Sequence, residues 1–290
     1  MDETTFSLAA ADGSDITVYL WTGDQAPNAV VQIAHGMGEH AGRYRRLARA
    51  LTDSGFFVYA NDQRGHGATA GSADHHGDLG PGGWSGLVSD LGELGAIARR
   101  EHPGVPLVLV GHSMGSFAVQ GYLLDHSDDV DGAVLSGTTA IDVVAPGIDP
   151  TKEVDLSAFN AAFEPARTEY DWLSRDPDEV DAYVADPACG FGLNPHATAS
   201  MLDGLVDTGE AARLAGIRPD LPIYLLSGDA DPLAGGGALI ELVADRYRQA
   251  GVKDVTVALY PGARHEVFNE TNRDDITADL VAWLARVTER

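Results

Sequence analysis

The residues best suited to chemistry in this sequence lie in the pentapeptide 111–115, which reads GHSMG. It follows the apolar run PLVLV at 106–110 and precedes an apolar stretch of helical character, FAVQGYLL. A G-x-S-x-G sequence between a strand and a helix is typical of a sharp turn that raises a serine oxygen above the edge of a sheet. Glycine is needed on either side because a larger side chain would collide with the adjoining strand or helix. We therefore predict that Ser113 is a nucleophile.

A serine hydroxyl is a weak nucleophile at neutral pH, so it needs an imidazole base that a carboxylate holds in place. In strand–turn–helix sites of this kind the chain order is serine, acid, histidine. Of the ten histidines, only His265 lies beyond the predicted strand at 222–227, in the loop PGARHEVFNE. It is the predicted base. Two carboxylates follow that strand in SGDADP, Asp229 and Asp231, and their spacing alone does not choose between them. One of the two would hold the imidazole, and the other would cap the turn.

The loop HGMGEH at 35–40 follows another predicted strand and is a candidate for binding negative charge. The start of the helix after Ser113 directs backbone N–H groups at the same place. We predict that the N–H groups of Met37 and Met114 hold the oxygen of a tetrahedral intermediate. Loss of one such donor typically costs about 2.7–4 kcal/mol of transition-state stabilisation.

Three histidines near these predicted strand ends, His35, His40 and His66, could suggest a metal site. The remaining ligands and the spacing of a metal site are missing, so hydrogen bonding within the scaffold is the preferred interpretation. We expect no bound metal. The serine chemistry needs no cofactor either.

The elements that must position these residues are short apolar runs rich in Val, Ile, Leu and Tyr. Most runs are continuous rather than alternating, as is typical of strands buried on both faces of a parallel sheet. Helical periodicity lies between them, with apolar stripes at Leu87, Leu91, Leu94 and Ala98 and at Ile276, Leu280 and Leu284. The alternation predicts a doubly wound α/β fold with right-handed crossovers. The predicted strands are 15–21, 29–34, 56–60, 106–110, 132–136, 222–227 and 254–259.

From about 140 to 215 the alternation stops, and short mixed segments are interrupted by prolines. An open parallel sheet binds ligands beyond the carboxyl ends of its strands, so an insertion after strand 132–136 would project over that edge. We predict one domain over 1–290, with a cap or lid at 140–215 inserted into a core of 1–139 and 216–290. A linker to a second domain is disfavoured because the strand pattern resumes at once after the segment.

The chain carries 44 acidic residues against 19 basic ones, a net charge of −25. A field of this sign repels nucleic acid and anionic membrane surfaces, so we expect no nucleic-acid partner. The single cysteine, Cys189, cannot form an internal disulfide and is expected to be a small buried side chain. The acidic amino terminus has no signal-peptide pattern, and no stretch approaches the roughly 18 apolar residues of a membrane span. We expect a soluble cytoplasmic monomer or homodimer without an integral membrane segment.

Taken together, the motifs HGMGEHAGRY, NDQRGHG, GHSMGS, SGDADP and YPGARHEVFNE are recognisable. The chain resembles the monoacylglycerol lipase and lysophospholipase-like (serine aminopeptidase S33-type) group of α/β-hydrolases, over nearly its whole length and with the motifs in the same order. The resemblance implies the α/β-hydrolase fold: a mostly parallel eight-stranded sheet flanked by helices, with a helical cap inserted after strand 6. It also implies a structural role for the turn that contains Asp62, Arg64 and His66.

The resemblance assigns roles residue by residue. It makes Asp231 the acid, and it places the oxyanion donors at Met37 and Met114. Glu39 and Arg43 match the acidic and basic positions of an E-H-x-x-R pattern that contacts glycerol in the family.

Further substrate contacts are predicted at three phenylalanines. Some of these lipases carry a histidine three residues after the catalytic one, and this chain has Phe268 at that position. Phe159 and Phe163 in the predicted cap could line an acyl tunnel, although packing of the cap on the core explains them as well.

The resemblance implies a serine carboxylic-ester hydrolase that acts on monoacylglycerol- or lysophospholipid-like esters through an acyl-enzyme, so the expected partner is a small ester or lipid. Alternatives within the fold are a generic short-chain carboxylesterase, a lactonase, a peptidase or a cofactor-free haloperoxidase. A catalytically inactive relative that only binds a ligand would need a missing triad residue. Ser113, Asp231 and His265 are all present.

Overall fold

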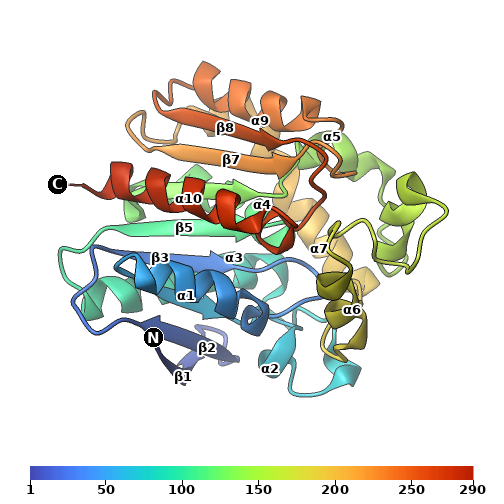
Figure 1. Cartoon of the computed structure of the whole chain (residues 1–290), viewed down its shortest axis with the longest axis horizontal. Helices are drawn as coiled ribbons and strands as arrows, with labels where there is room; N and C mark the ends of the chain where they lie inside the picture. The colour runs from blue at the N-terminus through green and yellow to red at the C-terminus, as the bar shows by residue number, and fades with distance from the viewer. Residues whose placement is uncertain (290) are drawn as a thin grey trace.

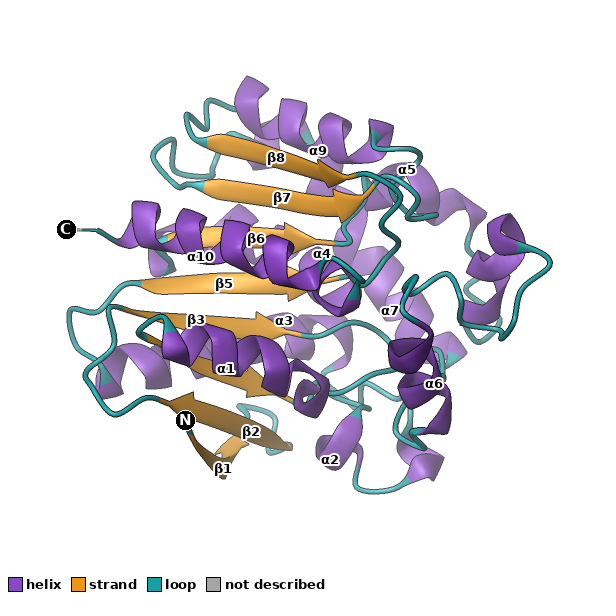
Figure 2. Cartoon of the chain, in the orientation of Figure 1, coloured by secondary structure: helices purple, strands orange, loops and turns teal. Residues whose placement is uncertain are grey.

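The computed structural model describes residues 1–289, which form one eight-stranded sheet with helices on both faces (Figures 1 and 2). The strand order is β1-β2-β4-β3-β5-β6-β7-β8, and every neighbouring pair from β4 to β8 is parallel. The strands are β1 (Asp2–Ala9), β2 (Asp15–Thr22), β3 (Ala29–Ala34), β4 (Phe56–Asn61), β5 (Leu107–His112), β6 (Gly132–Ser136), β7 (Ile223–Gly228) and β8 (Val255–Tyr260). The expectation of a mostly parallel eight-stranded sheet is confirmed.

The seven strands predicted from apolar runs all form, with ends within two residues of the expected ones. The eighth, β1, is an antiparallel edge strand whose side chains are mostly exposed, so it carries no continuous apolar run. By contrast β3, β5, β6 and β7 are buried at every position. Burial on both faces requires an apolar residue at nearly every position, so these strands can be predicted from continuous apolar runs in the sequence.

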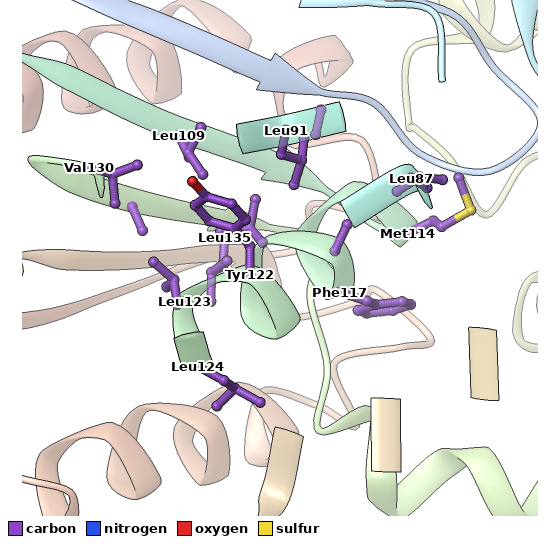
Figure 3. Packing of buried hydrophobic residues seen from close by; sticks show 14 of the residues in the cluster. Leu87, Leu91, Leu109, Met114, Phe117, Tyr122, Leu123, Leu124, Val130 and Leu135 are labelled. Carbon is purple, nitrogen blue, oxygen red and sulfur yellow. The ribbon is translucent and has the colours of Figure 1, made fainter. Parts of the chain in front are cut away.

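Two apolar clusters pack on the two faces of the sheet. Successive residues of a strand point to opposite faces, so Leu107 and Leu109 belong to one cluster while Val108 and Val110 belong to the other. The first cluster lies under α3 (Gly83–Glu101), α4 (Met114–His126) and α9 (Ala238–Gln249); Figure 3 shows α4 packed on β5 and β6. The second lies under α1 (Arg45–Asp53) and α10 (Arg273–Thr288), in front of the sheet in Figure 1.

Between β6 and β7 the chain leaves the sheet and forms helices beyond the carboxyl ends of the strands (Figure 2). Prolines that interrupt the sequence here begin helices rather than break them. Pro177 and Pro195 occupy the first position of their helices, where no N–H is needed, and Asp176 and Asn194 cap the same two helices through their side chains. The helices are α5 (Ile141–Val144), α6 (Pro177–Ala185), α7 (Pro195–Leu205) and α8 (Ala211–Leu214).

The turn after β4, which includes α2 (Gly67–Ala70), is held by two buried charges. The carboxylate of Asp62 accepts the backbone N–H groups of Ala41 (2.8 Å) and Ala68 (2.7 Å). The guanidinium of Arg64 donates to both carboxylate oxygens of Asp90 on α3, at 2.7 and 2.9 Å. The side chains of Arg64 and Asp90 are 5% and 2% exposed, so this pair is sealed from water. It fixes the end of β4 against the helix layer.

Removal of Asp90 tests this link. Asp90→Ala leaves a buried guanidinium without its main partner, so we expect the free energy of unfolding to fall by about 3–5 kcal/mol. Asp12 also contacts Arg64 but is more exposed, so Asp12→Ala should cost only about 0–1 kcal/mol. Urea denaturation of both variants measures the difference, and equal losses would contradict the burial argument.

Candidate active site

Ser113 occupies a sharp turn between β5 and α4. Its backbone has φ of 50° and ψ of −122°, and it is the one non-glycine residue in 1–289 with a positive φ. Such a conformation persists only where the surrounding structure enforces it. Here the N–H of Ser113 donates to the carbonyl of Ser136 at 2.9 Å, which ties the turn to the end of β6.

The glycines of the pentapeptide are required by close backbone approach. A Cβ on Gly111 would lie 2.5 Å from the carbonyl oxygen of Gly115. A Cβ on Gly115 would lie 2.2 Å from the carbonyl oxygen of Ala34, at the end of β3. The two glycines therefore let α4 begin directly against β3 and β5. This gives a physical reason for the G-x-S-x-G spacing.

The structure brings His265 and Asp231 together. Nδ1 of His265 lies 2.9 Å from Oδ2 of Asp231, and both side chains are nearly inaccessible to solvent. The other carboxylate oxygen of Asp231 accepts the N–H of Leu233 at 2.9 Å, which fixes its orientation. Asp229 instead accepts the N–H of Gly262 from an exposed position. The geometry thus separates the two carboxylates that spacing left open.

The electrostatics of His265 favour a basic imidazole. Burial is the largest influence on the pKa of His265 and would lower it, but the carboxylates of Asp231, Glu266 and Glu39 together outweigh burial, with Asp231 contributing most. The net result is a raised pKa. His112, whose ring centroid lies 4.8 Å from that of His265, is different: burial and the neighbouring His265 lower the pKa of His112 to about 4. One neutral and one basic imidazole therefore stand side by side.

The loop after β3 places Met37 beside Ser113 and His265, at the same cavity. Glu39 accepts the N–H of Gly36 at 2.5 Å, which closes the loop on itself. The carbonyl of Gly38 accepts the hydroxyl of Tyr183, from α6, at 2.8 Å. Gly38 has φ of 65°, and a Cβ there would lie 2.4 Å from the carbonyl oxygen of Phe191. The loop is therefore clamped between the sheet and the helices that cover it.

Ser113, His265, Met37 and Met114 line one cavity of about 290 Å³. Its wall is mostly apolar and is built by the sheet edge, α4 and the segment between β6 and β7. The ring of Trp172 lies with its centroid 4.8 Å from that of His265. The other apolar side chains of the wall are Phe117, Ile141, Val144, Ile148, Val154, Leu156, Phe159, Leu173, Met201 and Leu233, and its polar side chains are Glu39, His112, Tyr183 and Glu266.

The predicted substrate contacts fall in different places. Glu39 and Phe159 line the cavity, but Arg43, Phe163 and Phe268 do not. Phe163 packs instead on the guanidinium of Arg264, 4.4 Å from its ring centroid. Phe268 is a member of the apolar cluster under α1 and α10. Aromatic character in a sequence does not reveal which side of a loop faces the cavity. The role of Arg43, Phe163 and Phe268 as substrate contacts therefore stays a prediction.

Sequence reasoning missed Glu266 and Tyr183, which both line the cavity. Glu266 directly follows the predicted base, His265, in the chain. That neighbouring position was the one sequence signal that Glu266 lies near the site. A glutamate in a polar loop usually faces solvent, whereas this one is 6% exposed. Its burial depends on contacts with distant parts of the chain.

In residues 1–289, one group of side chains, His40, Asp186 and Cys189, brings potential metal-ligand atoms within 4.8 Å of one another. Nδ1 of His40 accepts the N–H of Gly42 at 3.2 Å, so the ring proton is on Nε2, which donates to Asp186 at 2.9 Å. To bind a metal beside Asp186, Nε2 of His40 would have to be free of its proton, with the proton on Nδ1 instead. Burial also raises the pKa of the Cys189 thiol. The donor set therefore fits a hydrogen bond between the loop after β3 and the segment between β6 and β7 better than a metal.

Residues 25–272 match the family "Serine aminopeptidase, S33". The chain belongs to this family of hydrolases. It is 35% identical to the monoacylglycerol lipase of Mycolicibacterium smegmatis over 283 residues, which cover 96% of this chain and 95% of that protein. It is 30% identical to human monoglyceride lipase, covering 97% and 90% of the two chains. The resemblance inferred from the motifs is confirmed.

Solved structures of an esterase and a lipase share the fold. A thermostable carboxyl esterase from Bacillus coagulans, solved in complex with glycerol, superposes with a TM-score of 0.88 at 28% identity over the whole of both chains. A lipase in an open form gives 0.85 at 28% identity, again over both whole chains. The α/β-hydrolase fold is therefore confirmed for this S33-family hydrolase. In residues 1–289 no helix combines the length and apolar character that a bilayer crossing requires.

The coupling between Asp231 and His265 can be measured directly. In Asp231→Asn the carboxylate that most strongly raises the pKa of His265 is lost, so that pKa should fall below its value in the unaltered protein. Titration of the histidine ring signals by NMR, with His265→Gln to assign the resonance, gives both values. Asp229→Asn, at an exposed position, should change the pKa of His265 much less. An equal change in the two variants would contradict the pairing of His265 with Asp231.

Proposed function

We propose that this S33-family hydrolase cleaves carboxylic esters of monoacylglycerol-like lipids through an acyl-enzyme on Ser113. One observation carries the proposal. A strained serine, two candidate oxyanion donors and a histidine paired with buried Asp231 meet at one mostly apolar cavity. The relatives named as monoacylglycerol lipases support the substrate class.

The mechanism follows from the positions of these groups. The Oγ of Ser113 attacks the ester carbonyl while Nε2 of His265 takes its proton, and Asp231 holds Nδ1–H and stabilises the imidazolium. The N–H groups of Met37 and Met114 receive the oxyanion. His265 then gives its proton to the leaving alcohol, which departs and leaves the acyl group on Ser113. Water repeats the two steps, releasing the fatty acid and restoring the serine.

The cavity supports an acyl chain rather than a polar chain as the group held next to Ser113. Its wall consists mainly of Leu, Ile, Val, Met and aromatic side chains, which suits a mostly apolar ligand with a few oriented polar atoms. Glu39 and Tyr183 supply polar atoms that suit the hydroxyls of a glycerol group. The carboxyl esterase from Bacillus coagulans, crystallised with glycerol, supports the same assignment.

Three finer points belong to the same proposal. We assign the cap to residues 140–215 and the core to 1–139 and 216–290. We place the protein in the cytoplasm as a monomer or homodimer that acts on a small ester or lipid. A short-chain carboxylesterase is the second candidate, because one similar structure is described as a carboxyl esterase.

Replacement of the nucleophile tests the proposal. Ser113→Ala should lower kcat for a p-nitrophenyl ester on the order of 10⁶-fold, to background, and should abolish labelling by a fluorophosphonate. Thermal unfolding should change little because only one hydroxyl is lost. Ser89→Ala, at an exposed position on α3, serves as the matched control and should keep both activities. Turnover retained in Ser113→Ala would overturn the assignment.

An acyl-chain series separates the two candidates. We expect kcat/KM for monoacylglycerols to rise as the chain lengthens, because each methylene that enters the apolar cavity contributes about 0.8 kcal/mol. Hydrolysis of glycerides with acyl chains of two to eighteen carbons, assayed below aggregation or in matched detergent, measures this. Activity confined to the shortest esters would instead favour the short-chain carboxylesterase.

A further inference from the structure

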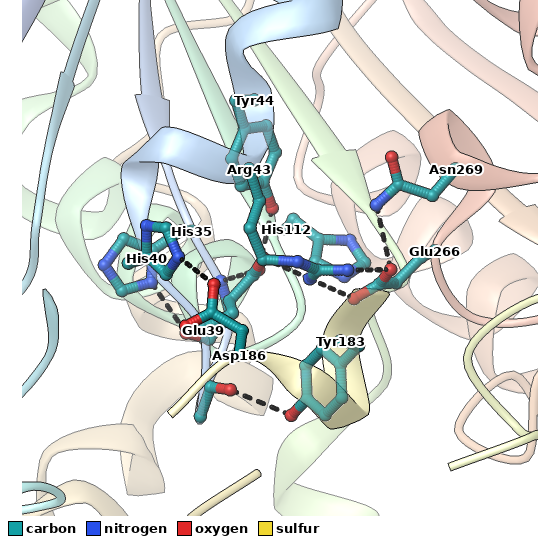
Figure 4. Close-up of polar contacts among 12 residues, drawn as sticks. His35, Glu39, His40, Arg43, Tyr44, His112, Tyr183, Asp186, Glu266 and Asn269 are labelled. Carbon is teal, nitrogen blue, oxygen red and sulfur yellow. Dashed lines mark hydrogen bonds and ion pairs between the residues drawn. The ribbon is translucent and has the colours of Figure 1, made fainter. Parts of the chain in front are cut away.

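A buried guanidinium lies between two loops of the candidate site (Figure 4). Nη1 of Arg43 donates to Glu39 at 2.8 Å and to Glu266 at 2.5 Å, and Nη2 donates to the second oxygen of Glu266 at 2.7 Å. The three side chains are 4–11% exposed. Glu39 and Glu266 line the cavity, whereas Arg43 lies behind them.

Each carboxylate is also bound to its own loop. Glu39 accepts the N–H of Gly36 at 2.5 Å and the hydroxyl of Tyr44 at 2.8 Å, so it fixes the loop that carries Met37. Glu266 accepts the side-chain amide of Asn269 at 2.8 Å and directly follows His265 in the chain. Charge-assisted, bidentate bonds of this kind fix direction as well as distance. One cation therefore connects the oxyanion loop to the histidine loop.

The segment between β6 and β7, here called the covering segment, contacts the same two loops. The ring centroid of Tyr183 lies 4.8 Å from the guanidinium carbon of Arg43, and its hydroxyl donates to Gly38. The N–H of Glu266 donates to the carbonyl of Leu173 at 2.8 Å. The connection made by Arg43 is thus enclosed, and neither carboxylate is free to exchange it for water.

We propose that Glu266, through Arg43 and Glu39, is a positioning residue that sets the place of the His265 imidazole relative to the oxyanion donor on Met37. The inference rests on the proposed function. Glu266 touches no reacting atom in this assignment and acts through the loop it shares with His265. Stability alone does not require such a cluster, because apolar side chains of similar volume often replace a buried ion pair without loss. Fixed direction between two loops is what the charged cluster supplies.

The same cluster acts on the charge of His265. Asp231, Glu266 and Glu39 face His265 as carboxylates, His112 faces it as a neutral imidazole, and Arg43 offsets the two glutamates from behind. Removal of the Glu266 charge should therefore lower the pKa of His265. A deprotonated base would persist to lower pH, so the acidic limb of the kcat/KM profile should move to lower pH.

Glu266→Gln is the central variant because it keeps the size of the side chain and removes the charge and the bidentate acceptor. We expect kcat to fall by about 10- to 100-fold with little change in KM. A displacement of the His265 imidazole by about 1 Å is enough to lower the rate by this factor. The acidic limb should move to lower pH. In Arg43→Met kcat should fall similarly, but the acidic limb should not move to lower pH, because both carboxylates remain.

Asp142→Asn and Arg246→Met are matched controls. This pair forms a comparable bidentate link, at 2.7 and 2.9 Å, between α9 and the helix α5 near the cavity, and it contacts neither loop. Both controls should retain kcat within about twofold and keep the same pH profile, as is usual for a link outside the reacting geometry.

The double variant Glu266→Gln/Arg43→Met keeps the test informative if a single variant fails to fold, since it removes both members of the bidentate pair together, and Glu39 keeps its bonds to Gly36 and Tyr44. If the two residues act as one link, the loss of kcat in the double variant should equal that of either single variant rather than their product. Normal kcat and an unmoved acidic limb in folded Glu266→Gln, or multiplicative losses in the double variant, would overturn the inference. An unaltered protein that cleaves no ester would instead overturn the proposed function.

Discussion

The parallel order of β3, β5, β6, β7 and β8 is the constraint on which the site depends. Parallel strands end on the same side, so the loops that follow them meet at one edge of the sheet. The oxyanion loop follows β3, the serine follows β5, the aspartate follows β7 and the histidine follows β8. The segment between β6 and β7 covers that edge and turns it into a cavity. Each group of the proposed mechanism therefore owes its place to strand order rather than to sequence proximity.

This edge also holds the features that cost the most free energy. Ser113 has a backbone conformation that is sparsely populated by non-glycine residues, and Asp231, Glu39 and Glu266 are buried carboxylates. Each carboxylate is offset by at least two donors, which include backbone N–H groups, an imidazole and a guanidinium. The hydrogen bonds that make burial tolerable also restrict the loops. The rigidity of the site and the stability of its charges have one physical source.

The covering segment and the histidine loop are joined along their backbones. The N–H groups of His265 and Glu266 donate to the carbonyls of Trp172 and Leu173, and the guanidinium of Arg175 pairs with buried Glu270 at 2.8 Å. Displacement of this part of the segment would therefore break hydrogen bonds to the loop that carries His265. Access to the cavity and the placement of His265 are physically coupled in this arrangement.

The sequence by itself determined seven of the eight strands, most of them because residues buried on both faces of a parallel sheet form continuous apolar runs. It also indicated Ser113, since the flanking glycines answer a local steric need, and His265, since only one histidine stands late enough in the chain. Only the tertiary structure decided which of Asp229 and Asp231 meets His265. It also decided that Phe268 belongs to the core and that Arg43 pairs with Glu266, 223 residues away. Such contacts depend on how the loops pack against one another and against the segment between β6 and β7, and no local pattern of residues encodes that packing.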